Sequence, residues 1–231
     1  MCTPGNYALL PKNCPAKGSL FHPEFLLSHP ERVHKVYKII LMKRILVIDN
    51  HDSFVYNLVQ ILRENEHCQF DIVYNDRIDF SVLGQYEKLL LSPGPGIPSE
   101  AGALLALIDR CKTTHSILGV CLGHQAIAEC IGARLQQLNY PKHGHPSSLT
   151  IVDPSDILYQ GITSPVKVGR YHSWVIAPHT LPPFLKVSAL DEDGNIMSFY
   201  HESLPLHGVQ YHPESIITTH GKEIINNWII Q

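Results

Sequence analysis

An apolar run leads directly into a cysteine between two glycines at residues 116–123, which read Ser116-Ile117-Leu118-Gly119-Val120-Cys121-Leu122-Gly123. A helix-like stretch follows at 124–134. This order predicts a strand, a sharp turn and a helix with Cys121 at the apex, which is the cysteine version of the nucleophile elbow. The glycines permit the tight turn, and the positive end of the helix favours a thiolate. A lone cysteine after an apolar strand is more often a small buried hydrophobe, so this motif alone is a modest signal.

A second motif lies near the C-terminus. The apolar run 206–211 ends at His212-Pro213-Glu214. His212 is the candidate base that activates Cys121, and Glu214 is the candidate group that holds the imidazole in one tautomer. His-x-Glu alone is weak evidence. Two such motifs, each at the end of a strand-like run, favour a catalytic interpretation over a structural one.

Composition excludes several classes of protein. The chain has 231 residues, 44% hydrophobic and 17% charged, which suits one α/β domain with a sizeable core. A net charge of −3 indicates neither a nucleic-acid surface nor an anionic-membrane surface. The six cysteines form no CxxC pair, which favours a reducing, cytoplasmic setting. Cys121-x-x-His124 has the spacing of metal ligands but no second pair, so we expect no metal site.

The first 41 residues differ from the rest of the chain. Prolines recur at positions 4, 11, 15, 23 and 30 and would break any long element. Residues 1–41 are therefore interpreted as a poorly ordered N-terminal extension or as a mis-assigned start. We favour translation from Met42, because Met42 opens directly into a good buried strand. Residues 42–231 are predicted to form one domain.

Strands and helices alternate after Met42. Strands are predicted at 45–48, 70–74, 88–91 and 116–120, and helices at 54–64, 100–112 and 124–134. Asp52 or Ser53 is the expected cap of the first helix. Beyond residue 135, short strands are predicted at 149–152, 166–171, 185–189, 196–200 and 206–211, before a final helix at 221–230. The pattern predicts an α/β fold: a doubly wound, mostly parallel sheet with flanking helices plus a small antiparallel sheet, with ligands beyond the carboxyl ends of the strands.

The loop after the third strand is the second informative segment. It reads Ser92-Pro93-Gly94-Pro95-Gly96, in which prolines stiffen the backbone and glycines expose it. Taken alone it is an ordinary tight turn. Beside a cysteine elbow, its exposed N–H groups favour an oxyanion hole made by the N–H groups of Gly96 and Leu122.

Five segments together resemble the class I, triad-type glutamine amidotransferases, whose fold is flavodoxin-like. They occur in family order and span 42–231: Asp49-Asn50-His51-Asp52-Ser53-Phe54, Leu91-Ser92-Pro93-Gly94-Pro95-Gly96, Gly119-Val120-Cys121-Leu122-Gly123-His124-Gln125, Gly169-Arg170-Tyr171-His172-Ser173 and Gln210-Tyr211-His212-Pro213-Glu214-Ser215. The motifs are specific to the superfamily. The segment Arg170–Ser173 points to the branch that serves chorismate-using synthases, namely anthranilate synthase component II or the aminodeoxychorismate (para-aminobenzoate) synthase glutaminase.

The resemblance implies a role for each matching residue. Cys121 attacks the side-chain amide of glutamine, His212 manages the protons and Glu214 supports His212. The residues expected to hold the substrate are Gly94, Pro95, Gly96, Gln125, Ser173 and Trp174. Gln125 lies one helical turn after Cys121, so it can face the same pocket.

A partner is also implied. The sequence contains no GxxxxGK[ST] phosphate loop and no evident domain that could activate an acceptor. The resemblance therefore implies a separate large chorismate-binding synthase subunit, component I, that receives the ammonia. It implies no cofactor in this chain, and Mg²⁺ in the partner synthase. Either tryptophan or folate synthesis, or both, would be served.

Some positions depart from the family pattern, and other interpretations remain open. His51 replaces the usual Tyr, Trp174 replaces the usual Leu, and the predicted loop 142–147 differs from the usual one. The alternatives are a stand-alone γ-glutamyl hydrolase or peptidase and a non-catalytic regulatory subunit on the same fold. Branches that serve guanylate or carbamoyl-phosphate synthesis are further possibilities.

Overall fold

The computed structural model describes residues 42–231, and the predicted extension 1–41 lies outside the described residues. Within 42–231 the strands form one nine-stranded sheet in the order β2-β1-β3-β4-β9-β8-β7-β5-β6. The strands are β1 Lys43–Asp49, β2 Cys68–Tyr74, β3 Lys88–Leu91, β4 Ser116–Val120, β5 Leu135–Ile151, β6 Val166–Ile176, β7 Leu185–Leu190, β8 Ile196–His201 and β9 Leu206–Val209. The helices are α3 Val55–Arg63, α4 Leu104–Cys111, α5 Leu122–Cys130 and α6 Gly221–Ile230.

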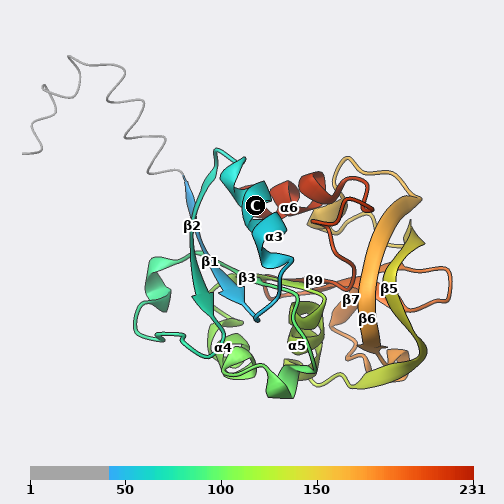
Figure 1. The fold of residues 1–231 in the computed structure, drawn as a ribbon, viewed down its shortest axis with the longest axis horizontal. Helices are drawn as coiled ribbons and strands as arrows, with labels where there is room; N and C mark the ends of the chain where they lie inside the picture. Colours follow the sequence, from blue (N-terminus) through green and yellow to red (C-terminus); the bar gives the residue numbers. More distant parts are fainter. Residues whose placement is uncertain (1–41) are drawn as a thin grey trace, which may run out of the picture. The chain divides into compact units, whose positions relative to one another are not determined.

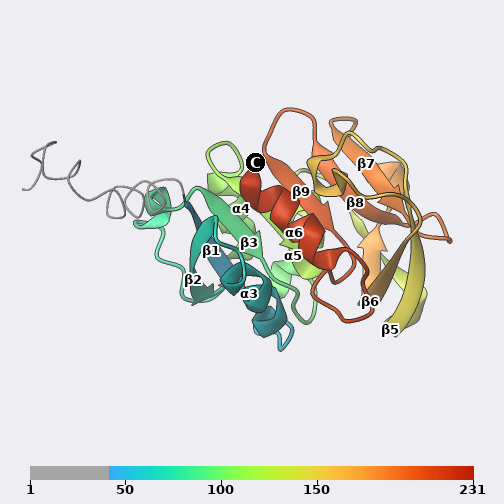
Figure 2. The ribbon, with the colours of Figure 1, turned by 90° about the horizontal axis from the view of Figure 1, so that it is seen from above.

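The predicted α/β class is confirmed. Strands β2, β1, β3, β4 and β9 pair in parallel, and β9, β8, β7, β5 and β6 continue the sheet in antiparallel fashion. The antiparallel strands thus extend the parallel sheet through the pairing of β8 with β9. Both views place β5 and β6 at the opposite end of the described fold from β1 and β2 (Figures 1 and 2).

Two hydrophobic cores lie on the two faces of the parallel strands, because successive side chains of a strand point to opposite faces. In β1, Ile45 and Val47 belong to the core that contains the buried faces of α3 and α6. Leu46 and Ile48 belong to the core that contains those of α4 and α5. Figure 1 shows the two helix pairs on opposite sides of the sheet. This is the doubly wound arrangement, and it explains why β1, β3 and β4 are almost continuously apolar.

Several predicted boundaries were wrong. The helix predicted at 124–134 is Leu122–Cys130, and the strand predicted at 166–171 extends to Ile176. The strand predicted at 149–152 begins at Leu135, and the predicted loop 142–147 lies inside it. Gly144 and Pro146 suggested a loop. Pairing with β6 outweighs that preference, and register shifts between Gln137 and Lys142 and between His143 and His145 absorb the irregular residues.

The start of α4 and the cap of α3 also differ from the prediction. The helix predicted at 100–112 begins at Leu104, because a short 3₁₀ turn, Pro98–Glu100, and Gly102 with φ +55° precede it. The cap of α3 is Phe54 and makes no side-chain capping bond. Asp52 instead accepts from the Phe54 N–H through Oδ1 at 2.7 Å.

The sheet brings four loops together. Strands β1, β3, β4 and β9 are adjacent and parallel, so the segments that follow their carboxyl ends meet at one edge. These segments contain Asn50, the Ser92–Gly96 loop, Cys121 and His212. Among residues 42–231, none of the helices has the length and apolar character that crossing a membrane requires.

Candidate active site

Cys121 occupies the strained turn that the sequence predicts. It caps the N-terminus of α5 with φ 52° and ψ −100°, a conformation rare for a residue with a side chain. The flanking glycines are needed for packing: a Cβ on Gly119 would overlap the Gly123 backbone, and a Cβ on Gly123 would lie 2.6 Å from the Leu91 Cβ. The turn is therefore held between α5 and β3, with the sulfur at the positive end of the helix.

His212 and Glu214 lie just beyond the end of β9. The His212 N–H donates to the Gly169 carbonyl at 3.0 Å, which ties this segment to β6. Nδ1 of His212 lies 2.7 Å from Oε1 of Glu214, and both side chains are buried. That contact leaves Nε2 as the ring nitrogen available for chemistry. Nε2 is buried and makes no hydrogen bond of normal length to the described residues.

The surroundings of His212 favour its charged form. Burial lowers its pKa, but the Cys121 sulfur and the Glu214 carboxylate outweigh burial and raise the pKa to about 10. His212 is thus an imidazolium at neutral pH and can give a proton to a leaving group.

Two aromatic rings enclose His212. Phe54 and Tyr171 meet its ring edge-on, with ring centroids 5.0 Å and 4.9 Å away. The Tyr171 hydroxyl lies 3.2 Å from the Ser215 Oγ. Both rings come from segments that carry the family resemblance, but the sequence assigned neither a role because they belong to distant parts of the chain.

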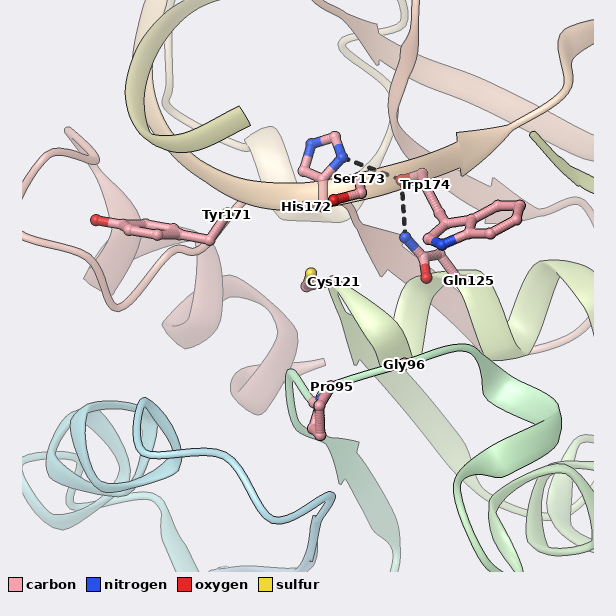
Figure 3. A pocket seen from close by; sticks show the side chains of 9 residues that line it. Pro95, Gly96, Cys121, Gln125, Tyr171, His172, Ser173 and Trp174 are labelled. Carbon is pink, nitrogen blue, oxygen red and sulfur yellow. Dashed lines mark hydrogen bonds between the residues drawn. The ribbon is translucent and has the colours of Figure 1, made fainter. Parts of the chain in front are cut away.

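A pocket of about 230 Å³ opens over the Cys121 sulfur (Figure 3). It lies between the Pro95–Gly96 loop and β6, and all six predicted substrate-binding residues line it: Gly94, Pro95, Gly96, Gln125, Ser173 and Trp174. Tyr171 and His172 complete the lining. The structure brings these residues together with the nucleophile, while their roles in binding stay predictions.

The two candidate oxyanion donors come from two segments, the loop after β3 and the start of α5. Gly96 lines the pocket with φ +73°, a conformation that favours glycine. Leu122 is the first residue of α5, so its N–H has no acceptor within the helix. The oxyanion-hole role of this pair remains a prediction.

Gln210 is a site residue that sequence reasoning missed. Its Nε2 lies 3.7 Å from the Cys121 sulfur as a donor, and its Oε1 accepts from Gln125 Nε2 at 3.1 Å. The available signal was its position two residues before His212, immediately after β9. It is fully buried and bridges the segment after β9 to α5.

Metal-binding geometry is absent from the part of the chain that the structure describes, where no three His, Cys, Asp or Glu side chains are grouped as ligands. His124 is fully buried against Phe199, with ring centroids 4.7 Å apart. Burial lowers the pKa of His124 to about 3, so it stays neutral. In the structure, the spacing Cys121-x-x-His124 separates the predicted nucleophile from a fully buried core residue.

His51, in the loop after β1, adopts φ 60° and stacks on Tyr74 with ring centroids 4.6 Å apart. Its Nε2 lies 3.5 Å from Asp76 Oδ1, and both side chains are about half exposed. The substitution thus leaves an aromatic stack at the surface, outside the pocket.

Known proteins match most of the chain. The sequence model of the family "Glutamine amidotransferase class-I" matches residues 46–231. Anthranilate synthase component 2 of Mycobacterium tuberculosis H37Rv is 43% identical over 197 residues, which cover 80% of this chain and 81% of that protein. Aminodeoxychorismate/anthranilate synthase component 2 of Bacillus subtilis is 41% identical over 187 residues, which cover 80% and 95%.

A solved structure is similar as well. A Thermoplasma acidophilum protein, described provisionally as part of a GMP synthase, superposes with a TM-score of 0.73 at 29% identity and covers 81% of this chain and 92% of its own. The region that matches the family model, 46–231, contains every residue that lines the pocket over Cys121.

Proposed function

Because the chain belongs to the class I glutamine amidotransferase family, we propose that it is a glutaminase subunit that hydrolyses L-glutamine at Cys121 and passes the ammonia to a chorismate-using synthase. One observation supports this most: the nucleophile at the helix N-terminus, the His212–Glu214 pair and the pocket meet at one edge of the sheet. The names of the relatives support a synthase of the anthranilate or aminodeoxychorismate type.

The first half of the reaction releases ammonia. The Cys121 thiolate attacks the side-chain amide carbon, and the amide oxygen takes the negative charge beside the N–H groups of Gly96 and Leu122. The C–N bond then breaks, its electrons go to nitrogen, and His212 supplies the proton that completes NH₃. A γ-glutamyl thioester and a neutral His212 remain.

The second half restores the enzyme. Neutral His212 takes a proton from water, and the hydroxide attacks the thioester carbon. The C–S bond breaks, its electrons return to sulfur, and glutamate leaves. His212 is then charged again, and Glu214 stabilises that charge through the 2.7 Å contact with Nδ1. Ammonia must leave the site before water can take its place. Because ammonia is a useful nucleophile only while it is unprotonated, it must reach the synthase by a route shielded from bulk solvent.

The test is product formation from glutamine and chorismate by the full chain, supplied in turn with each candidate large subunit. Anthranilate with one subunit would assign the chain to tryptophan synthesis, aminodeoxychorismate with the other to folate synthesis, and both products to a shared role. Glutamine hydrolysis without either product would contradict the chorismate assignment and leave a glutaminase. Faster cleavage of γ-glutamyl peptides than of glutamine would favour a γ-glutamyl hydrolase instead.

A further inference from the structure

The carbonyl oxygen of Trp174 is a junction of hydrogen bonds at the pocket wall. It accepts from Gln125 Nε2 at 2.9 Å and lies 3.0 Å from Nδ1 of His172 (Figure 3). A carbonyl can only accept, so Nδ1 of His172 must carry the proton. The position of this carbonyl therefore depends on His172, and the Gln125 amide depends on the carbonyl.

The same contacts fix which atom Gln125 presents to a ligand. Its Nε2 donates to Trp174 O and also to Gln210 Oε1, at 2.9 Å and 3.1 Å. Both amide hydrogens are thus used within the protein, and Oε1 remains as an acceptor at the pocket. A flipped amide would place its oxygen against two other acceptors, so the orientation is set by the network.

Arg170 sets the tautomer of His172 from the other side. Its Nε donates to Nε2 of His172 at 3.1 Å, and a guanidinium has no acceptor, so Nε2 must be unprotonated. Burial, together with the nearby charges of Arg170 and His212, lowers the pKa of His172 to about 3. His172 is therefore neutral, with its proton held on Nδ1.

Asp191 in turn holds Arg170. The two side chains are completely buried and paired through Arg170 Nη1 and Asp191 Oδ2. Oδ1 of Asp191 accepts from the N–H groups of Asp193 and Asn195 at 3.0 Å and 2.7 Å, in the turn between β7 and β8. The ion pair thus anchors the network in a tight turn of a neighbouring hairpin.

We propose that Arg170 and Asp191 are positioning residues for glutamine binding, which act through His172 and the Trp174 carbonyl to aim the Gln125 Oε1 into the pocket. The ligand group that this acceptor fits is an N–H donor, either the ammonium or the amide of the substrate. This inference rests on the proposed glutamine pocket. It gives the arginine of the Arg170–Ser173 segment a role at a distance from the substrate, because Arg170 is fully buried and does not line the pocket.

Protection of Cys121 from alkylation measures glutamine binding in the full chain without a partner. Iodoacetamide modifies Cys121, and peptide mass analysis distinguishes this cysteine from the others. The glutamine concentration that halves the rate of Cys121 alkylation reports the affinity for glutamine. The variant is Arg170→Met/Asp191→Asn, which removes both buried charges together and keeps an oxygen for the turn. We expect the half-protecting concentration to rise about fivefold or more, as loss of one oriented hydrogen bond gives. The alkylation rate without glutamine should stay within about twofold of the original, because the elbow is untouched.

Two comparisons separate positioning from general loosening. His207→Gln disrupts a different His–carboxylate pair, His207–Asp156, in which the histidine is partly buried and neither residue lines the pocket, and should leave protection unchanged. His172→Gln can place its amide oxygen near the position of Nε2 as an acceptor for Arg170, but it has no donor at the position of Nδ1, and it should weaken protection. Adding the Arg170/Asp191 changes to His172→Gln should then cause little further loss, because both act through one path. If the combined variant instead lost glutamine protection by the product of the two separate losses, the proposal would be overturned.

The His172 tautomer can also be measured directly, in the unaltered chain and in the double variant. Imidazole ¹⁵N shifts of the full chain should show neutral His172 with its proton on Nδ1 at neutral and mildly acidic pH, and should show mixed tautomers in the double variant. A proton on Nε2, or a charged ring at neutral pH, would overturn the positioning proposal alone. Failure of glutamine to protect the unaltered chain would instead overturn the proposed glutamine pocket.

Discussion

Cys121 combines strain and reactivity at one residue. A residue with a side chain at φ 52° and ψ −100° persists because β4, α5 and β3 fix its neighbours. The geometry holds the sulfur at the helix N-terminus, where negative charge is favoured. The backbone strain is therefore a cost of placing the nucleophile, and substitutions should reveal it.

The strain predicts an order of stability among inactive variants. Both Cys121→Ala and Cys121→Gly should lose glutamine hydrolysis. Glycine tolerates positive φ, so Cys121→Gly should be the more stable of the two by about 1 kcal/mol, despite its greater loss of entropy on folding. Urea unfolding of both variants measures this difference. An alanine variant as stable as the glycine variant would show that the turn is not strained.

His212 gives a prediction for pH. Its folded pKa of about 10 exceeds its ordinary value of 6.5, so its contribution to stability is complete below pH 6.5 and is lost as pH rises toward 10. In Glu214→Gln the folded pKa should be lower, because an amide stabilises the imidazolium less than a carboxylate does. The free energy of unfolding should therefore fall less across this range in the variant than in the original chain.

The original chain is the control for other groups. Lys88, whose pKa burial lowers to about 8, titrates in the same range in both chains, so its effect cancels in the difference. Urea unfolding at several pH values from 6.5 to 10 supplies the data. Parallel pH profiles would contradict the proposed coupling of Glu214 to His212.

At this scale the sequence was sufficient for residues in local motifs. Cys121, His212 and Glu214 could be named because each follows a recognisable run. Gln210 could not, because its contacts with Cys121 and Gln125 depend on which strands are neighbours. The tautomer of His172 depends on Arg170 and Trp174, which lie two residues away in β6, but their spacing alone does not say which ring nitrogen each one contacts.

At the scale of elements, the elbow depends on how closely α5 approaches β3 and β4. A Cβ on Gly119 would overlap the Gly123 backbone, which cannot move without shifting α5 and the nucleophile. The glycines of the motif thus serve the packing of a helix against two strands as well as the turn itself.

The matched substitutions are Gly119→Ala and Gly84→Ala. Gly119→Ala should destabilise the fold by about 3 kcal/mol, at the upper end of the usual cost of overpacking, and should abolish glutaminase activity. Gly84→Ala adds a methyl group where no atom lies within 4 Å, so it should change stability by less than about 1 kcal/mol and keep full activity. Thermal unfolding and ammonia release check both. Equal behaviour of the two variants would contradict the packing argument.

Elements with strong periodicity could be predicted, and irregular ones could not. β3 and α6 begin and end where the sequence indicated, because buried apolar residues mark the extent of each. The first half of β5 was missed, since Gly144 and Pro146 hide a strand whose pairing with β6 is long-range. β5 lies between β7 and β6, and its pairing with β6 holds His172 and Trp174 in place.

At the scale of the molecule, the parallel sheet collects the catalytic groups and the antiparallel extension supplies the opposite pocket wall. The pocket of about 230 Å³ lies beside the exposed Pro95–Gly96 loop, and its size suits an amino acid. Ammonia is a useful nucleophile only while it is unprotonated, so it needs a partner that shields it. Ammonia made without that partner would be lost, so we expect the partner also to govern the rate of glutamine hydrolysis.

Partner dependence follows from this arrangement. The isolated chain should hydrolyse glutamine slowly, and addition of the cognate large subunit with chorismate should raise the rate about tenfold or more, as ordering of the site by about 1.4 kcal/mol would give. Ammonia release with and without the large subunit measures the effect. A full rate in the isolated chain, unaffected by partner and chorismate, would contradict it.

The most direct test of the central claim compares nitrogen sources in the complex of this chain with its large subunit. The unaltered complex should form the aminated chorismate product from either glutamine or ammonium. The Cys121→Ala complex should form it from ammonium at an undiminished rate and not from glutamine. Glutamine-supported product in the Cys121→Ala complex would contradict the account, because the amide nitrogen would then be released without the proposed nucleophile.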